Sequence, residues 1–290
     1  MLNKMSVIKN YFDTDLYNIE EVLSILEMND YLNGNNNTDK FNTFLKDVIE
    51  HYTPIPKAIN NPHGIWTDSI FGGGDTKYYG NFVAELFNLC IQKYSNSNDI
   101  YFKPSEKPVF QYSIISLNYD LVLESAFNFL NNNYDNMKTI NFNKNLKNKQ
   151  NSVRLSKLHG CIEMGNIVPP TWNKNSNTQL VDTWKGAQKQ LSEANHIRIL
   201  GYSLPLSDSY MKYMFKSSIL ESAHLKSIDV IALDPNGEVQ KRYDDFIDFK
   251  HYSFRDRDIK DYLMYLNPKP ISNTEHIFNK LEEVHGFFMK

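Results

Sequence analysis

The sequence predicts an α/β protein: a Rossmann-like, doubly wound, mainly parallel sheet with an additional helical region at the N-terminus. From residue 106 onward, short β-rich runs alternate with helical segments, which is the rhythm of βαβ units. Two of these runs, "IRIL" and "IDVIAL", are apolar without alternation, as expected for strands that are buried on both faces. Residues 1–105 instead carry the apolar periodicity of helices.

The N-terminal part is predicted to contain three helices. The stretch "NIEEVLSILEMNDYL" (18–32) places its apolar residues on one helical stripe, and "KFNTFLKDVIEHY" (40–52) does the same until Pro54 and Pro56 end it. A third helix is predicted in "NFVAELFNLCIQKY" (81–94), after a loop that contains "FGGGDT". We expect these helices to form a smaller lobe packed on the sheet.

The core is predicted to alternate strands with helices. Strands are expected within residues 111–117, 153–159, 196–204, 227–235 and 251–254. Helices are expected within residues 120–132, 183–194 and 208–222. We expect one domain over residues 1–290, made of a helical part (1–105), a Rossmann-like core (106–260) and a C-terminal helix for packing or oligomer contact (261–290).

Composition and charge exclude several classes of protein. The net charge of the 290 residues is −3, so the chain does not carry the basic charge of a nucleic-acid binder. The two cysteines, Cys90 and Cys161, cannot form a four-cysteine zinc site or a secreted disulfide framework. The N-terminal residues lack a signal-peptide core, and no run approaches the roughly 20 apolar residues of a membrane span. We therefore expect a cytoplasmic protein without membrane contact.

Polar or small residues follow four successive predicted strands. They are Asn118 and Asp120, His159 and Gly160, Gly201 with Ser203 and Asp208, and Asp234 within "DPNG". Each has a plain structural interpretation, since Asn and Asp favour turns, a lone His is often structural, and Asp208 is well placed to cap a helix. Because the carboxyl ends of parallel strands share one edge of a sheet, together they favour a nucleotide-binding crevice.

Such residues predict a definite chemistry. Asp234 or Asp120 is suited to accept hydrogen bonds from a ribose hydroxyl, and the Gly201–Ser203 loop allows backbone N–H groups to approach a phosphate. His159 can act as a base near neutral pH, and Asn118 can hold a water or a carboxamide. This set fits cleavage of a glycosidic bond between ribose and a leaving base such as nicotinamide. The sequence shows no metal-ligand spacing.

The same residues resemble a known family. The segments "SLNYDLVLESAF", "KLHGCIEMGNIVPPTWNK", "WKGAQKQLSEANHIRILGYSLPLSDSYMKYMF" and "ALDPN" occur in the order of the motifs of the sirtuin-like NAD-consuming domains of bacterial antiphage defence. The resemblance covers residues 112–236. It implies that NAD is the substrate, cleaved to nicotinamide and ADP-ribose after phage infection is sensed, so that the cell is depleted of NAD in abortive infection.

The resemblance also assigns roles by position. Asn118 and His159 correspond to the pair needed for NAD hydrolysis, and Asp120 belongs to the same motif as Asn118. The positions that correspond to nucleotide contacts are Gly160, Gly201, Ser203, Leu204 and Asp234. Relatives often form homo-oligomers, or take their trigger from a phage component through a partner such as an ATPase or a sensor. Deacetylase sirtuins bind zinc through two C-x-x-C pairs, which two cysteines cannot supply, so the resemblance points to a metal-free NAD glycohydrolase.

One family feature is not found in the sequence. Family members open with a strand and a Gly-Ala-Gly-x-Ser loop that binds the NAD phosphates. Here the first residues resemble the part of the family that follows this loop, as if the sequence began after it. In "FGGGDT" (71–76) we see neither a preceding strand nor a clean helix behind it, so a surface loop is favoured over a phosphate loop. Two alternatives to the hydrolase therefore stay open: a non-catalytic sirtuin-like subunit that binds a nucleotide or a protein partner, and an unrelated nucleotide-sugar or nucleoside enzyme.

Overall fold

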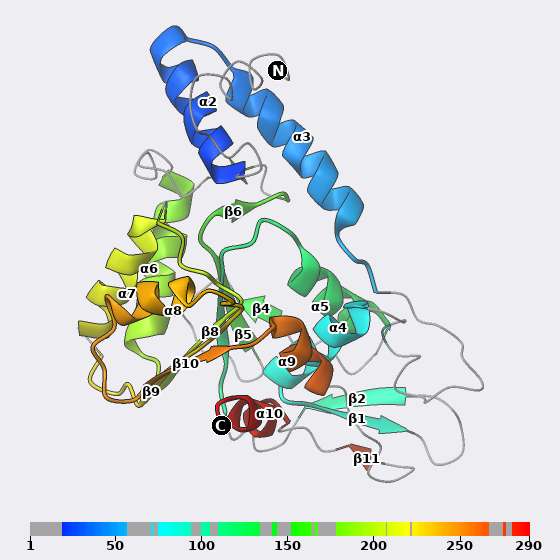
Figure 1. The fold of residues 1–290 in the computed structure, drawn as a ribbon. Helices are drawn as coiled ribbons and strands as arrows, with labels where there is room; N and C mark the ends of the chain where they lie inside the picture. The colour runs from blue at the N-terminus through cyan, green and yellow to red at the C-terminus, as the bar shows by residue number, and fades with distance from the viewer. Residues whose placement is uncertain are drawn as a thin grey trace.

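The helices and strands of the chain form an α/β fold with two parallel sheets and helices on both sides (Figure 1). The computed structural model describes residues 19–56, 71, 75–93, 100–104, 110–133, 141–143, 152–163, 166–167, 178–206, 208–220, 222–266, 275–276 and 280–290. The predicted fold class, a Rossmann-like arrangement with additional N-terminal helices, is confirmed.

The elements follow one another along the chain in this order. The helices are α2 (Ile19–Asn33), α3 (Asn37–Tyr52), α4 (Asp75–Leu86), α5 (Val122–Asn133), α6 (Thr178–Ser192), α7 (Ser209–Leu220), α8 (Glu238–Asp244), α9 (Ile259–Tyr265) and α10 (Lys280–Phe288). The strands are β1 (Leu89–Lys93), β2 (Ile100–Pro104), β3 (Ser113–Ser116), β4 (Asn141–Asn143), β5 (Ser152–Lys157), β6 (Gly160–Cys161), β7 (Asn166–Ile167), β8 (His196–Leu200), β9 (Ser227–Ala232), β10 (Tyr252–Asp256) and β11 (Glu275–His276).

The parallel strands form two sheets of three strands each. In one sheet the order is β3-β5-β4, and in the other it is β10-β9-β8. Every neighbouring pair in both sheets is parallel. Parallel neighbours need crossover connections: α7 lies between β8 and β9, α8 lies between β9 and β10, and α5 lies between β3 and β4, on the way to β5. Helix α6 instead leads from β5 in one sheet to β8 in the other. Within each sheet the strands therefore end at the same edge.

The surroundings of β9 explain why apolar and polar residues do not alternate in its sequence. Ile228, Val230 and Ala232 are buried in the core that α6, α7 and α8 form, whereas Ile231 is buried in a second core. Residues of α4, α5, α9 and α10 make up most of that second core. Successive side chains of a strand point to opposite faces, so helices on both faces require apolar residues at almost every position.

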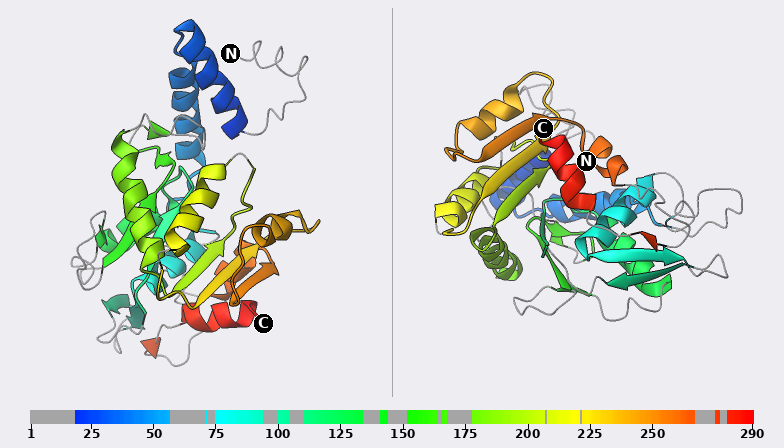
Figure 2. Two further views of the ribbon diagram at one scale, coloured as in Figure 1. Left: turned by 90° about the vertical axis from the view of Figure 1, so that its left-hand side faces the viewer. Right: turned by 90° about the horizontal axis from the view of Figure 1, so that it is seen from below.

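Helices α2 and α3 form a hairpin that projects from the rest of the molecule (Figure 2). Their buried residues, Val22, Leu23, Leu26, Phe41 and Leu45, pack against Ile162 and Ile167 at the β6–β7 hairpin. Tyr119 and Leu121 also pack against this cluster. The α2–α3 hairpin therefore rests on the loop that carries Asn118 and Asp120. Helix α4, which was expected in the same lobe, instead packs in the core with α5, α9 and α10.

One N-terminal prediction was wrong. Residues 81–94 were expected to be one helix, but α4 ends at Leu86 and β1 begins at Leu89, where it pairs with β2 and β11 in an antiparallel sheet. Asn88 lies between them with a φ of 52°, and a residue in this left-handed region ends an α-helix. Residues 1–105 thus contain β1 and β2 as well as helices.

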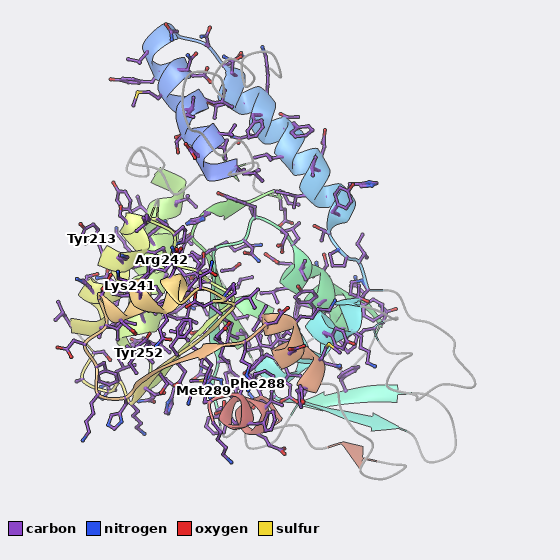
Figure 3. All side chains as sticks on the ribbon, viewed as in Figure 1. Tyr213, Lys241, Arg242, Tyr252, Phe288 and Met289 are labelled. Atoms are coloured by element: carbon purple, nitrogen blue, oxygen red, sulfur yellow. The ribbon has the colours of Figure 1, made fainter. Side chains whose placement is uncertain are left out.

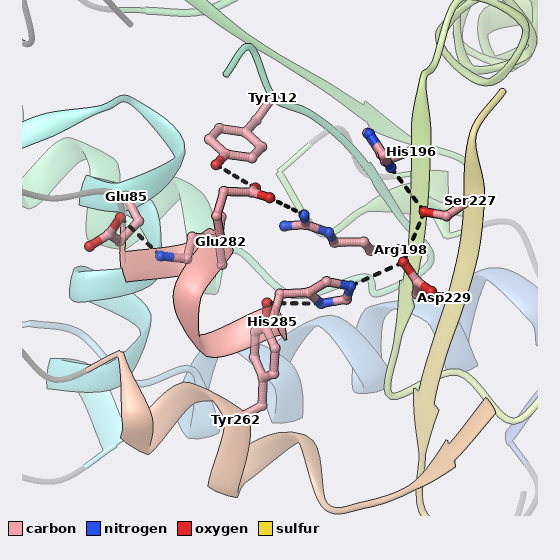
Figure 4. Close-up of polar contacts among 10 residues, drawn as sticks. Glu85, Tyr112, His196, Arg198, Ser227, Asp229, Tyr262, Glu282 and His285 are labelled. Carbon is pink, nitrogen blue, oxygen red and sulfur yellow. Dashed lines mark hydrogen bonds and ion pairs between the residues drawn. The ribbon is translucent and has the colours of Figure 1, made fainter. Parts of the chain in front are cut away.

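Helix α10 is packed near the amino ends of the parallel strands, at the opposite end of the molecule from the α2–α3 hairpin (Figure 2). A network of polar side chains joins α10 to the residue before β3 and to β8 and β9 (Figure 4). Among the residues that the structure describes, no helix is long and apolar enough to cross a membrane.

Candidate functional site

Contacts between four loops assemble the candidate site at the carboxyl ends of the parallel strands. These loops follow β3, β5, β8 and β9, as the sequence predicts. Hydrogen bonds join the loop after β3 to the turn after β5, the contact between His159 and Asp208 joins that turn to the loop after β8, and two hydrogen bonds join the loop after β8 to α8, the helix that follows β9. The polar residues listed from the sequence are therefore brought to one edge, although they come from distant parts of the chain.

The loop after β3 and the turn after β5 run side by side. The backbone N–H of Leu158 donates to the carbonyl of Ser116 at 3.0 Å, and that of Ile162 donates to the carbonyl of Tyr119 at 3.1 Å. The Tyr119 ring lies 5.9 Å from the imidazole of His159, between ring centres. Trp184 of α6 holds the turn from the other side, since its indole N–H donates to the carbonyl of Leu158. Asn118 and His159 are thus placed on adjoining segments.

His159 is deeply buried and faces a buried carboxylate. Only 2% of His159 and 1% of Asp208 is exposed. Nε2 of His159 lies 3.5 Å from Oδ2 of Asp208, and the same oxygen accepts a hydrogen bond of 2.8 Å from the hydroxyl of Tyr202. This contact joins the turn after β5 to the loop after β8. It gives the histidine a defined electrostatic partner.

The loop after β8 has an unusual backbone, and α8 holds it in place. Gly201 and Leu204 have φ values of 69° and 50°, and a left-handed leucine is uncommon enough to indicate a constrained loop. From α8, Nε of Arg242 (labelled in Figure 3) donates to the carbonyl of Ser203, and the hydroxyl of Tyr243 donates to the carbonyl of Tyr202. The side chain of Leu204 is fully buried in the core, so only its backbone can face a ligand.

Asn118 and Asp120 occupy different positions on the loop after β3. Asn118 is exposed, and its backbone N–H donates to Oγ of Ser116. Oδ1 of Asp120 accepts from the backbone N–H of Val122, the first residue of α5, and so helps to start that helix. Lys157, the last residue of β5, donates to the carbonyl of Asp120. Hydrogen bonds therefore fix this loop on both sides of Tyr119.

The carboxylate of Asp234 is hydrogen-bonded to the first turn of α8, the helix that follows it. Its Oδ1 and Oδ2 accept hydrogen bonds from the backbone N–H groups of Val239 and Gln240, at the start of α8. Burial raises the pKa of this carboxyl, but backbone hydrogen bonds from Gln240, Val239 and Glu238 outweigh burial and lower the pKa overall. Gly160 is buried in β6 with a φ of 77°, a conformation that glycine adopts without strain.

Two sequence motifs lie wholly or partly outside the described residues. The segment "VPPTWNK" is not described, and neither are Gly72–Gly74 of "FGGGDT". The expectation that no helix follows "FGGGDT" was wrong, because α4 begins at Asp75. Gly80 interrupts the helical pattern of this segment, but the ring of Phe71 packs against it so closely that a Cβ would lie 2.3 Å from Cδ1.

The sequence singled out Asp208 as a helix cap and gave Tyr202 no role. The contact of Asp208 with His159 depends on how the loops after β5 and β8 meet, and no local pattern encodes that meeting. The motif "GYSLPLSD" does contain both residues, so their spacing within one loop was visible. Within the described part of the chain, no cluster of three or more His, Cys, Asp or Glu side chains is arranged to hold a metal ion.

Comparison with known proteins gives a family match for the part of the chain that contains the candidate site. Residues 112–254 match the model of the SIR2-like domain, a family that uses NAD, and the match runs from the residue before β3 into β10. A search of curated proteins finds no match for the chain. The matched segment contains all four loops of the candidate site. Over residues 112–254 the chain is therefore similar to the SIR2-like domain, which supports a sirtuin-like family.

Proposed function

We propose that this chain is an NAD glycohydrolase, which cleaves NAD to nicotinamide and ADP-ribose and acts in abortive-infection antiphage defence by depleting NAD. The observation that carries the proposal is the approach of the loop after β3 to the turn after β5. It places exposed Asn118 beside the segment that holds buried His159, at the carboxyl edge of the sheet. That edge is where open α/β sheets bind nucleotides.

The proposed reaction breaks the bond between C1′ of the ribose and the ring nitrogen of nicotinamide. The electron pair of this bond neutralises the positive charge of the pyridinium ring, so nicotinamide leaves as a neutral molecule. A water oxygen forms the new bond to C1′, and His159 accepts the proton that the water loses, directly or through a ribose hydroxyl. A general base of this kind contributes about 100- to 10,000-fold to a rate.

The other residues bind and orient. The exposed amide of Asn118 has both a donor and an acceptor, which suits it to hold the water or the nicotinamide ribose. Asp120 orients this loop, because its carboxylate and its carbonyl are both engaged with neighbouring elements. The backbones of Gly160, Ser203 and Leu204 are the candidates for contact with the rest of NAD, whereas the N–H of Gly201 already donates to the carbonyl of Ile231. Fixed loops of this kind lower the barrier by holding the reacting groups in place.

The proposal includes partners. We expect the chain to act as a homo-oligomer or with a second defence protein, such as an ATPase or a sensor, that responds to a phage component. The α2–α3 hairpin is a suitable place for control, since it packs directly on Tyr119 and Leu121 beside the site. Movement of the hairpin would be transmitted to Asn118 and Asp120 through these two contacts.

NAD consumption by the purified chain tests the proposal. Nicotinamide and ADP-ribose would be separated by chromatography and quantified over time, for the wild type and for Asn118→Ala and His159→Gln. We expect equal amounts of both products from the wild type and at least a 100-fold slower reaction from His159→Gln. Circular dichroism and thermal unfolding would show that each variant is folded.

Two results would count against the hydrolase. Full activity in folded His159→Gln would remove this residue from the mechanism. A folded wild type that binds NAD without cleaving it, alone and with its partner, would favour the non-catalytic nucleotide-binding subunit.

A further inference from the structure

The buried pair of His159 and Asp208 has a chemical consequence for the histidine. A carboxylate that is 1% exposed needs compensation for the water it has lost, and Asp208 obtains part of it from the hydroxyl of Tyr202. The same Oδ2 atom faces Nε2 of His159 at 3.5 Å. Nε2 is itself buried, and among the described residues it forms no hydrogen bond within normal geometry, so the charge contact with Asp208 is the polar contact that the structure gives it.

We propose that Asp208 is a positioning residue that fixes the tautomer of His159. A neutral imidazole carries one ring proton, and an ionised carboxylate only accepts hydrogen bonds. A carboxylate opposite Nε2 therefore favours the tautomer with the proton on Nε2, which leaves the lone pair on Nδ1. Nδ1 is then the atom that takes a proton, and the negative charge of Asp208 stabilises the imidazolium ion that results.

Tyr202 completes the arrangement. Its hydroxyl donates to Asp208, and its carbonyl accepts from the hydroxyl of Tyr243 on α8. Tyr202 thus holds the carboxylate of Asp208, and α8 in turn holds the backbone of Tyr202. Asp208 acts on the reaction only through His159. This consequence for catalysis rests on the proposed NAD hydrolysis, whereas the tautomer does not depend on it.

The tautomer can be measured directly. The two ring nitrogens of a histidine have different ¹⁵N chemical shifts according to which carries the proton, so NMR of the protein labelled at its histidines reports the state of His159. Comparison with His159→Gln identifies its signals among the eight histidines. We expect Nε2 to be protonated and Nδ1 not. Protonation of Nδ1 in the wild type would overturn the proposal.

Asp208→Asn tests the cause. An amide has the same size but can donate its N–H to Nε2, so we expect the proton to move to Nδ1 in this variant. For NAD turnover we expect kcat to fall about 100-fold or more while KM changes little, since the base would carry its lone pair on the wrong nitrogen. Asp182→Asn, at an exposed position of α6, is the matched control and should change neither readout.

The two readouts separate this proposal from the proposed function. An Nε2–H tautomer that Asp208→Asn reverses, in a chain that never cleaves NAD, would leave the role of Asp208 intact and refute the hydrolase. An active wild type whose folded Asp208→Asn variant keeps both its tautomer and its kcat would do the opposite.

Discussion

Arg198 of β8 and Glu282 of α10 form an ion pair in which Nη2 and Oε2 lie 2.5 Å apart. The second oxygen of Glu282 accepts a hydrogen bond of 2.8 Å from the hydroxyl of Tyr112, the residue before β3 (Figure 4). One carboxylate therefore joins the C-terminal helix to both parallel sheets. Both members of the ion pair are largely buried, so each depends on the other for the hydrogen bonds that water would otherwise supply.

Glu282→Gln is expected to destabilise the protein by about 1–3 kcal/mol, because it leaves a largely buried guanidinium without its charged partner. Urea unfolding followed by circular dichroism measures the change. Glu283→Gln is the control, since this neighbouring residue of α10 is exposed. Equal losses of stability in the two variants would show that removal of any negative charge from α10 destabilises the protein, and that the contact with Arg198 contributes nothing more.

Acid is expected to weaken the attachment of α10. Burial raises the pKa of Asp229 and of Glu282, but Asp229 accepts hydrogen bonds from His285 and Ser227, and Glu282 accepts them from Arg198 and Tyr112. The net result is that both pKa values are lowered from their ordinary values of 3.8 and 4.5. A carboxyl with a lowered folded-state pKa stabilises the fold above its unfolded pKa. This contribution is lost as the pH falls through the folded-state value.

Urea unfolding at a series of pH values between 6 and about 3 checks this prediction. The free energy of unfolding should fall below pH 4.5, where these carboxyls begin to take up protons in the unfolded chain. A double variant with Asp229→Asn and Glu282→Gln should show a shallower dependence on pH over the same range. A slope as steep as that of the wild type would assign the acid sensitivity to other carboxyl groups.

The sequence predicts best those features that depend on local chemistry. The apolar run of β9 and the polar residues at the ends of the strands could both be identified from the sequence. Burial on two faces selects apolar residues, and loops at strand ends select polar or small ones. The switch from α4 to β1 was missed, since the left-handed conformation of Asn88 decides it and the other asparagines that the structure describes do not adopt this conformation.

Long-range pairings were not predictable from the sequence. His159 and Asp208 meet because the loops after β5 and β8 reach the same edge, and Glu282 reaches Arg198 because α10 returns to the sheets from the end of the chain. Each partner has an ordinary local role on its own, as a turn residue, a helix cap or a helix surface charge. Only the assembled fold distinguishes these roles from the ones that the contacts reveal.

Lys157→Met is expected to loosen the loop that carries Asn118. Nζ of Lys157 lies 3.0 Å from Oε1 of Glu124 on α5 and donates to the carbonyl of Asp120. Methionine keeps the apolar part of the side chain but removes the charge, so we expect a loss of about 1–3 kcal/mol of stability and slower NAD cleavage. Lys185→Met on the exposed face of α6 is the control.

A double-mutant cycle with Glu124→Gln shows whether the effect arises from this ion pair. Residues in direct contact have coupling energies of about 0.5–3 kcal/mol, whereas independent residues give additive changes. Additive losses of stability would mean that Lys157 acts through the carbonyl of Asp120 alone.

Asp234→Ala is expected to lower the melting temperature, because two backbone N–H groups at the start of α8 lose their acceptor. Asp234→Asn should lower it less, since the amide keeps one oxygen that can accept.

The same variants test the assignment of Asp234 to the ribose of NAD. If the two carboxylate oxygens serve α8 alone, KM for NAD stays near the wild-type value in Asp234→Asn, whose helix is largely retained. A large rise in KM in that variant, with Asp248→Asn unchanged at its exposed position, would show that Asp234 also binds the substrate.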